Sequence, residues 1–131
     1  MDRPIAKEIA WVAAGGALGA AIRHGTNQLV FEILGENRFF IATSIENILG
    51  CFFIGVIYTL LSRRTVKYRN LNLFLLTGVI GSYTTYSGFM ADNLLLFAES
   101  IPLLLMYAFS QLIVGLIAVM TGIGLMKKYY S

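Results

Sequence analysis

Four long apolar stretches run along the chain, and short polar links separate them. They cover about residues 9–34, 39–61, 71–97 and 101–126. A helix needs ~20 mostly apolar residues to cross the hydrocarbon core of a bilayer, and each stretch is long enough. Because the links hold only a few residues, consecutive helices should pack antiparallel as hairpins. The pattern predicts an all-α membrane protein, with one domain over residues 1–131 and four transmembrane helices.

The composition agrees with this pattern. Of the 131 residues, 57% are hydrophobic and 13% are charged, and the mean hydropathy is +0.73. Such a chain has too few polar residues to cover a soluble domain, so soluble enzyme folds are excluded and membrane lipid is the expected surrounding. The net charge of +3 does not indicate a nucleic-acid partner, since no long polar surface remains to follow phosphates.

The Lys and Arg residues divide unevenly between the two sides of the predicted bundle. Eight of the ten lie before the first span, in the second link or after the last span: Arg3, Lys7, Arg63, Arg64, Lys67, Arg69, Lys127 and Lys128. On the opposite side there is only Arg38, and Arg23 lies within the first span. Positive residues favour the cytoplasmic side. We therefore expect a multi-pass protein of the cell (plasma) membrane with both termini in the cytoplasm.

Ionisable residues inside the spans are the first candidates for function, because they are costly in hydrocarbon. They are Arg23, Glu46 and Asp92. Arg23 either pairs within the bundle or attracts anions, and Asp92 is close enough to a span end to reach the headgroup region. Asn47 lies on a partly polar stripe of the second span, where it either joins two helices or lines a pore.

Residues 78–88 of the third span form a poor lipid-facing helix. Glycines alternate there with Ser, Thr and Tyr, which lower helix propensity or offer the backbone other partners. We expect this helix to be broken near its middle, inside the protein. Freed carbonyls suit a small cation, and hydroxyl protons suit a small anion. On a helix, Tyr83 and Tyr86 would share a face with Ser87, either to touch an anion with their ring edges or simply to pack.

These residues resemble the Fluc (CrcB) fluoride channel family. The matching motifs are Gly15-Gly16-x-x-Gly19-Ala20-x-x-Arg23, Asn47-x-x-Gly50-x-x-x-x-Gly55 and Gly78-x-x-Gly81-x-Tyr83-Thr84-Thr85-Tyr86-Ser87. The resemblance covers essentially the whole chain. It implies a subunit of a fluoride-selective channel that exports fluoride passively and so relieves fluoride toxicity. It also implies an antiparallel dimer of the dual-topology type.

The resemblance also implies roles for single residues. The implied fluoride path consists of Asn47, Tyr83, Thr84, Thr85, Tyr86, Ser87, Tyr107 and, on a looser match, Ser110. Tyr83 and Tyr86 stand where the family usually has phenylalanines whose ring edges line the path. Arg23 would draw anions toward the vestibule. Backbone carbonyls of Gly78 and Gly81, from both subunits, would hold a structural sodium ion (Na+), while fluoride is the permeant ion.

The chain departs from the family pattern in two residue types. The tyrosines at both ring positions add hydroxyls, which can donate to fluoride, narrow the path or obstruct it. Glu46, next to Asn47, places a carboxylate beside an anion path, where it repels fluoride unless it is protonated, turned away or paired, for instance with Arg23.

The uneven Lys and Arg distribution bears on the dimer. A subunit that inserts in both orientations should show little such bias. We therefore expect this chain to pair with an oppositely oriented homologue, and an antiparallel homodimer is the alternative.

Two other functions are compatible with four short spans. One is a proton-coupled exporter of cationic compounds, similar to the small multidrug resistance family, although that family's glutamate is in the first span and Glu46 is in the second. The other is a subunit that conducts nothing itself, such as the non-conducting partner in a heterodimeric fluoride channel. An enzyme is not expected, because a single His, a single Cys and scattered carboxylates supply neither a metal cluster nor a nucleophile with its base.

Overall fold

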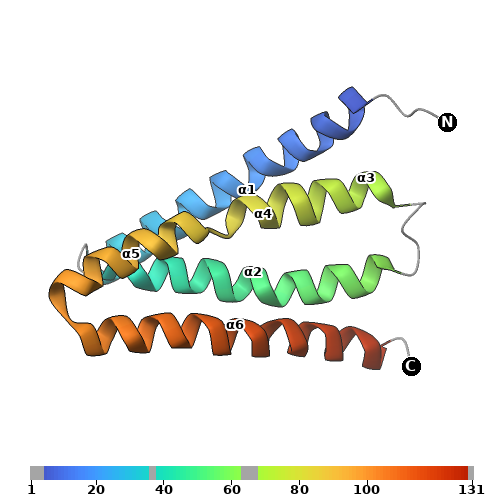
Figure 1. Ribbon diagram of the computed structural model, residues 1–131. Coiled ribbons are helices and arrows are strands. Elements are labelled where there is room, and N and C mark those ends of the chain that lie inside the picture. The colour runs from blue at the N-terminus through green and yellow to red at the C-terminus, as the bar shows by residue number, and fades with distance from the viewer. Residues whose placement is uncertain (1–4, 36–37, 63–67, 130–131) are drawn as a thin grey trace.

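Three long helices dominate the computed structural model, which describes residues 5–35, 38–62 and 68–129. They are α1 (Ile5–Leu34), α2 (Phe39–Ser62) and α6 (Ile101–Tyr129). Each is long and apolar enough to cross a membrane. Figure 1 shows these helices extending along the bundle, with both termini at one end.

Four shorter elements, also all helical, make up the segment between α2 and α6. They are α3 (Arg69–Asn72), the π-helix η2 (Leu73–Ile80), α4 (Gly81–Tyr83) and α5 (Tyr86–Glu99). Together they return along the bundle toward the end where α6 begins (Figure 1). η2 packs mainly against α1, whereas α5 packs against α6 and α2. The chain is an all-α membrane protein. The segment between α2 and α6 changes its main packing partner between η2 and α5.

Glycines allow the helices to approach closely. A Cβ at Gly15 or Gly19 of α1 would overlap a backbone carbonyl oxygen of η2, and a Cβ at Gly78 would meet the backbone of Gly15. Likewise, Gly55 of α2 and Gly122 of α6 each face the backbone of the other helix. Small residues at such contacts are typical of helix packing in membranes, where backbones gain van der Waals contact by coming close.

The outer surface is strongly apolar. On α6, for example, Met106, Leu112, Leu116 and Met120 are each more than 60% exposed. A surface of this size and hydrophobicity is not stable against water. It fits contact with lipid tails, as the hydropathy of the sequence predicts.

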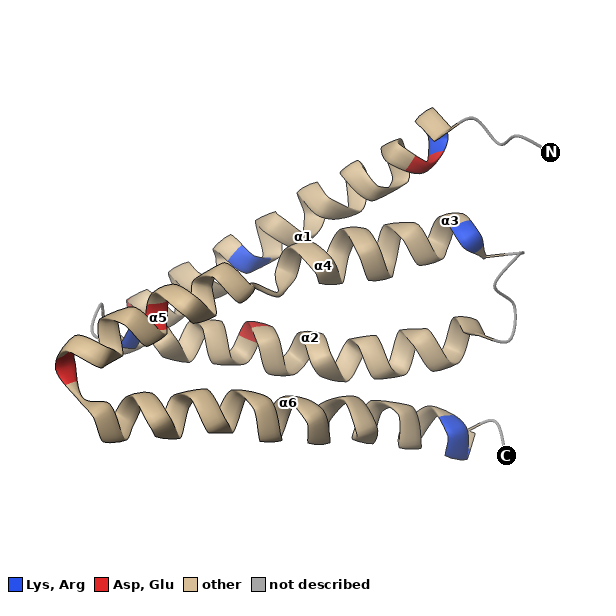
Figure 2. Cartoon of the chain, viewed as in Figure 1, with Lys and Arg blue, Asp and Glu red and all other residues tan. Residues whose placement is uncertain are grey.

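Positive residues gather at the end of the bundle that holds both termini (Figure 2). Lys7 lies in the first turns of α1, Arg69 begins α3, and Lys127 and Lys128 are in the last turn of α6. There the Arg69 Nε lies 2.9 Å from an oxygen of Glu8, and this ion pair joins α3 to α1. Four other positive residues counted on this side, Arg3, Arg63, Arg64 and Lys67, fall outside the described residues.

Candidate functional site

The helical backbone is interrupted at two threonines. α4 ends at Tyr83, Thr84 is extended with φ −75° and ψ 153°, and Thr85 with φ −143° and ψ 113°. The Thr85 N–H donates to Asn47 Oδ1 at 2.9 Å, and Asn47 Nδ2 donates to the Thr85 carbonyl at 3.2 Å. Asn47 of α2 therefore binds both backbone groups of the extended residue.

Gly78 and Gly81 both precede this interruption and are themselves helical. Gly78 is in η2 and buried against α1, and its carbonyl accepts from the Gly81 N–H. Gly81 is exposed, and a Cβ built on it would lie 3.6 Å from its nearest neighbour, the Leu76 carbonyl oxygen. The Thr85 N–H, which a continued helix would direct to the Gly81 carbonyl, is bound by Asn47 instead. Of the two, only Gly81 presents its backbone at an open surface of the subunit.

Tyr83 and Tyr86 lie on opposite sides of the interruption. The shared face with Ser87 that one continuous helix would give these two tyrosines is therefore not formed, because two extended residues change both the direction and the rotation of the chain. The Tyr83 hydroxyl lies 3.4 Å from that of Thr26 on α1. Tyr86, at the start of α5, is 75% exposed.

A further aromatic ring, which the sequence motifs did not single out, lies next to Tyr86. Phe89 is one turn further along α5, its ring centroid 6.3 Å from that of Tyr86 and 5.4 Å from that of Tyr107 on α6. Phe40 of α2 packs edge-on against Tyr107 at 6.0 Å. The i, i+3 spacing from Tyr86 was the available signal, and it applies because both residues are on α5.

Tyr107 and Asp92 form a buried pair. The Tyr107 hydroxyl donates to Asp92 Oδ2 at 2.8 Å, and these residues are 4% and 6% exposed. Asp92 is thus held between α5 and α6 rather than exposed on the outer surface of the subunit. Ser110 is exposed, and its hydroxyl donates to the Tyr107 carbonyl on the same helix at 2.8 Å.

The other hydroxyls of the implied path stabilise the interruption. Thr84 Oγ1 donates to the Ile80 carbonyl at 3.0 Å and closes the end of α4. Thr85 Oγ1 accepts from the Gly88 N–H at 2.9 Å and so caps the N-terminus of α5. The Ser87 hydroxyl lies 3.3 Å from that of Thr85. Thr85 and Ser87 thus place neighbouring hydroxyls at the start of α5.

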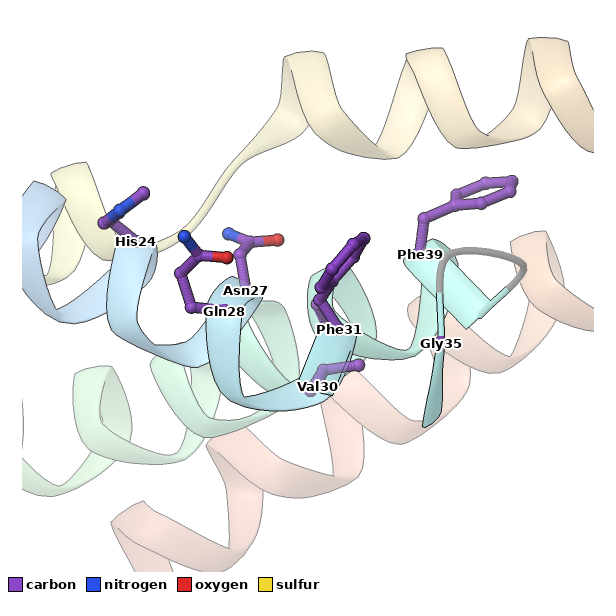
Figure 3. A pocket seen from close by; sticks show the side chains of 8 residues that line it. His24, Asn27, Gln28, Val30, Phe31, Gly35 and Phe39 are labelled. Carbon is purple, nitrogen blue, oxygen red and sulfur yellow. The ribbon is translucent and has the colours of Figure 1, made fainter. Parts of the chain in front are cut away.

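These two residues lie at an open polar pocket of about 440 Å³ between α1, α2 and α5. The lining of this polar pocket comprises Ala20, Arg23, His24, Asn27, Phe39, Thr43, Glu46, Thr85, Ser87, Gly88 and Asp92. A smaller pocket of about 210 Å³ adjoins it and shares His24, Asn27 and Phe39. In Figure 3 this smaller pocket is lined by side chains of α1 and by Phe39 at the start of α2.

Glu46 is fully buried at the wall of the polar pocket, with 1% of its surface exposed. Asn27 Nδ2 donates to its Oε1 at 2.7 Å. Arg23 lines the same pocket, yet within the part of the chain that the structure describes no ion pair joins it to Glu46. The partner of this carboxylate is therefore a neutral amide of α1.

Comparison with known proteins matches nearly the whole chain. Residues 10–123 match the family described as CrcB-like protein, Camphor Resistance (CrcB). A fluoride-specific ion channel FluC of Flavobacterium psychrophilum is 35% identical over 93% of this chain and 98% of its own length. The protein of that name in Agrobacterium fabrum is 36% identical over the same shares. Fluoride-specific ion channel FluC 1 of Moorella thermoacetica is 40% identical over 89% of this chain and 84% of its own length.

Proposed function

Because the chain belongs to the CrcB family, we propose that it is a subunit of a fluoride-selective ion channel. The main support for this proposal is that relatives named as fluoride-specific ion channels align with the chain over nearly their full length. The chain is thus a channel subunit rather than an enzyme. Passive export of fluoride through it would relieve fluoride toxicity.

The polar pocket supplies the chemistry that fluoride requires. Fluoride is small and strongly hydrated, so close donors must replace its water. The Thr85 and Ser87 hydroxyls supply such donors at the pocket wall, and Arg23 adds a positive charge that attracts anions. The path continues along Tyr86 and Tyr107, and Phe89 lies between these two rings. Asn47 acts by holding the extended backbone at Thr85.

A second, oppositely oriented subunit would complete the path. The segment from α3 to α5 serves as the fourth membrane span, since it runs the length of the bundle (Figure 1). Its interruption leaves Gly81 and Tyr86 exposed on a single subunit, where an antiparallel dimer covers them. The Gly81 carbonyl fits a ligand of a structural sodium ion shared by both subunits. Gly78 fits less well, because it is buried and its carbonyl is bonded within the helix.

The proposed orientation follows from the gathered positive charges. Both termini and the link between α2 and α3 face the cytoplasm, because Lys and Arg are retained there. Such a fixed orientation favours pairing with an oppositely oriented homologue over pairing with a second copy.

Fluoride efflux from liposomes tests the proposed function. The purified chain is reconstituted alone and then together with an inverted homologue, and a fluoride electrode follows efflux, with chloride efflux as the control. Fluoride-selective efflux from the chain alone establishes a homodimeric channel. Efflux only with the homologue establishes a heterodimer, and no efflux in either preparation contradicts the proposed function.

A further inference from the structure

We propose that Glu46 limits the passage of fluoride through the polar pocket, and that Asn27 is a positioning residue that holds the Glu46 carboxylate at the pocket wall. This inference rests on the proposed channel function. It concerns a carboxylate placed where an anion path would be expected to lack one. Glu46 would set the flux through the subunit without being one of its fluoride-binding groups.

Glu46 is close to the donors of the path. It lines the polar pocket together with Thr85 and Ser87, and on α2 it directly precedes Asn47, which holds the interrupted backbone. An anion in this pocket thus lies beside the wall to which Glu46 belongs. An ionised carboxylate there repels an anion, and the repulsion strengthens as the effective dielectric of the site falls.

The charges around Glu46 do not cancel it. Asn27 donates one hydrogen bond to Oε1 but carries no charge, and among the described residues no ion pair joins Glu46 to Arg23. Asp92 adds a second carboxylate to the pocket lining, and His24 is the remaining titratable group there. The pocket lining therefore holds one guanidinium and two carboxylates, and the carboxylates offset part of the attraction of Arg23 for anions.

Asn27 decides where the Glu46 charge lies. It extends from α1 and lines the polar pocket, and it also lines the smaller pocket beside it, which Figure 3 shows. Its amide also donates to the Arg23 carbonyl at 3.0 Å on its own helix, which fixes the side chain against α1. A carboxylate bound to this amide remains 1% exposed. Without that partner it would turn toward the water and donors of the pocket, because a buried unpaired carboxylate is costly.

Glu46→Gln tests the inference directly. Glutamine is nearly isosteric, and its amide oxygen still accepts from Asn27, so the fold is retained while the charge is removed. We expect fluoride efflux from liposomes to rise about threefold or more, and the ratio of variant to wild type to shrink as an impermeant salt raises ionic strength. The fluoride to chloride ratio should stay unchanged, since the carboxylate repels both anions.

The matched control is Glu32→Gln. Glu32 is exposed on the same helix as Asn27 and lines neither pocket, so its variant reports the general effect of removing one negative charge. Glu46→Met, which is neutral and of similar length, is the second variant if Glu46→Gln does not yield folded dimer. Size-exclusion chromatography checks each preparation.

The role of Asn27 is read from a double-mutant cycle. Asn27→Leu should lower fluoride efflux in the wild-type background, because the released carboxylate turns into the pocket. In the Glu46→Gln background the same change should alter efflux by less than half as much. A purely structural role of Asn27 would give equal effects in both backgrounds and would overturn its assignment as a positioning residue.

The outcomes separate this inference from the proposed function. If the wild-type assembly conducts fluoride and Glu46→Gln conducts no more, or loses selectivity for fluoride over chloride, or gains no more than Glu32→Gln, the inference is overturned and the proposed channel function is unaffected. Efflux from Glu46→Gln where the wild type is silent supports both. Silence of the wild type and of Glu46→Gln, alone and with an inverted homologue, overturns both.

Discussion

Single side chains at the interruption satisfy the backbone that the helix leaves unpaired. In a membrane-embedded segment an unpaired N–H or C=O costs several kcal/mol, so an interruption persists only where side chains replace the lost hydrogen bonds. Asn47 does so for both groups of Thr85, and Thr85 in turn binds the Gly88 N–H. The extended conformation therefore depends on a few specific side chains.

Asn47→Leu should destabilise the subunit by about 1–3 kcal/mol, because it leaves a partly buried donor and acceptor without partners. Leucine is similar in size to asparagine, so packing changes little. Thermal unfolding in detergent measures the loss, and fluoride efflux should fall with it. Asn93→Leu is the matched control, since among the described residues Asn93 Nδ2 bonds the Phe89 carbonyl of its own helix and no backbone group of another helix. Equal destabilisation by the two variants would contradict this role for Asn47.

The helix that carries a residue determines how well its position could be predicted from the sequence. The hydropathy pattern predicted α1, α2 and α6 nearly to their ends, because long apolar helices follow from length and composition alone. The sequence indicated a break only somewhere within residues 78–88, and its position at Thr84 and Thr85 depends on hydrogen bonds from α2. Phe89 was missed because Tyr86 was paired with Tyr83, which lies across the interruption, where helical periodicity does not apply.

The contact between α1 and η2 depends on backbone proximity, which glycine alone permits. Gly15→Ala should lower stability by about 1–3 kcal/mol, because its Cβ would overlap the Phe74 carbonyl oxygen and force the helices apart. Gly16→Ala, one residue later, places its Cβ in open space and should leave stability unchanged or slightly higher. Unfolding temperatures in detergent compare the two. Equal unfolding temperatures of the two variants would show that α1 and η2 do not approach each other as closely as they do in the structure.

The whole molecule has a charge asymmetry that single spans do not reveal. The two termini and α3 lie at the same end of the bundle (Figure 2), and positive residues of three chain segments are found there. Among the described residues each of these helix ends carries one or two positive side chains, and their effects on the orientation of insertion add together. Orientation is therefore a property of the assembled topology.

A matched pair of cysteines tests that orientation in cells. In a Cys51→Ser background, Ser62→Cys marks the end of α2 near the termini, and Ser100→Cys marks the turn between α5 and α6 at the opposite end. Serine and cysteine are close in size and both uncharged, so the Lys and Arg distribution is untouched. A membrane-impermeant maleimide added to intact cells should label the cysteine at position 100, and the one at position 62 only after permeabilisation. Partial labelling of both positions in intact cells would show that the chain inserts in two orientations. Two copies could then form an antiparallel homodimer, and no homologous partner would be required.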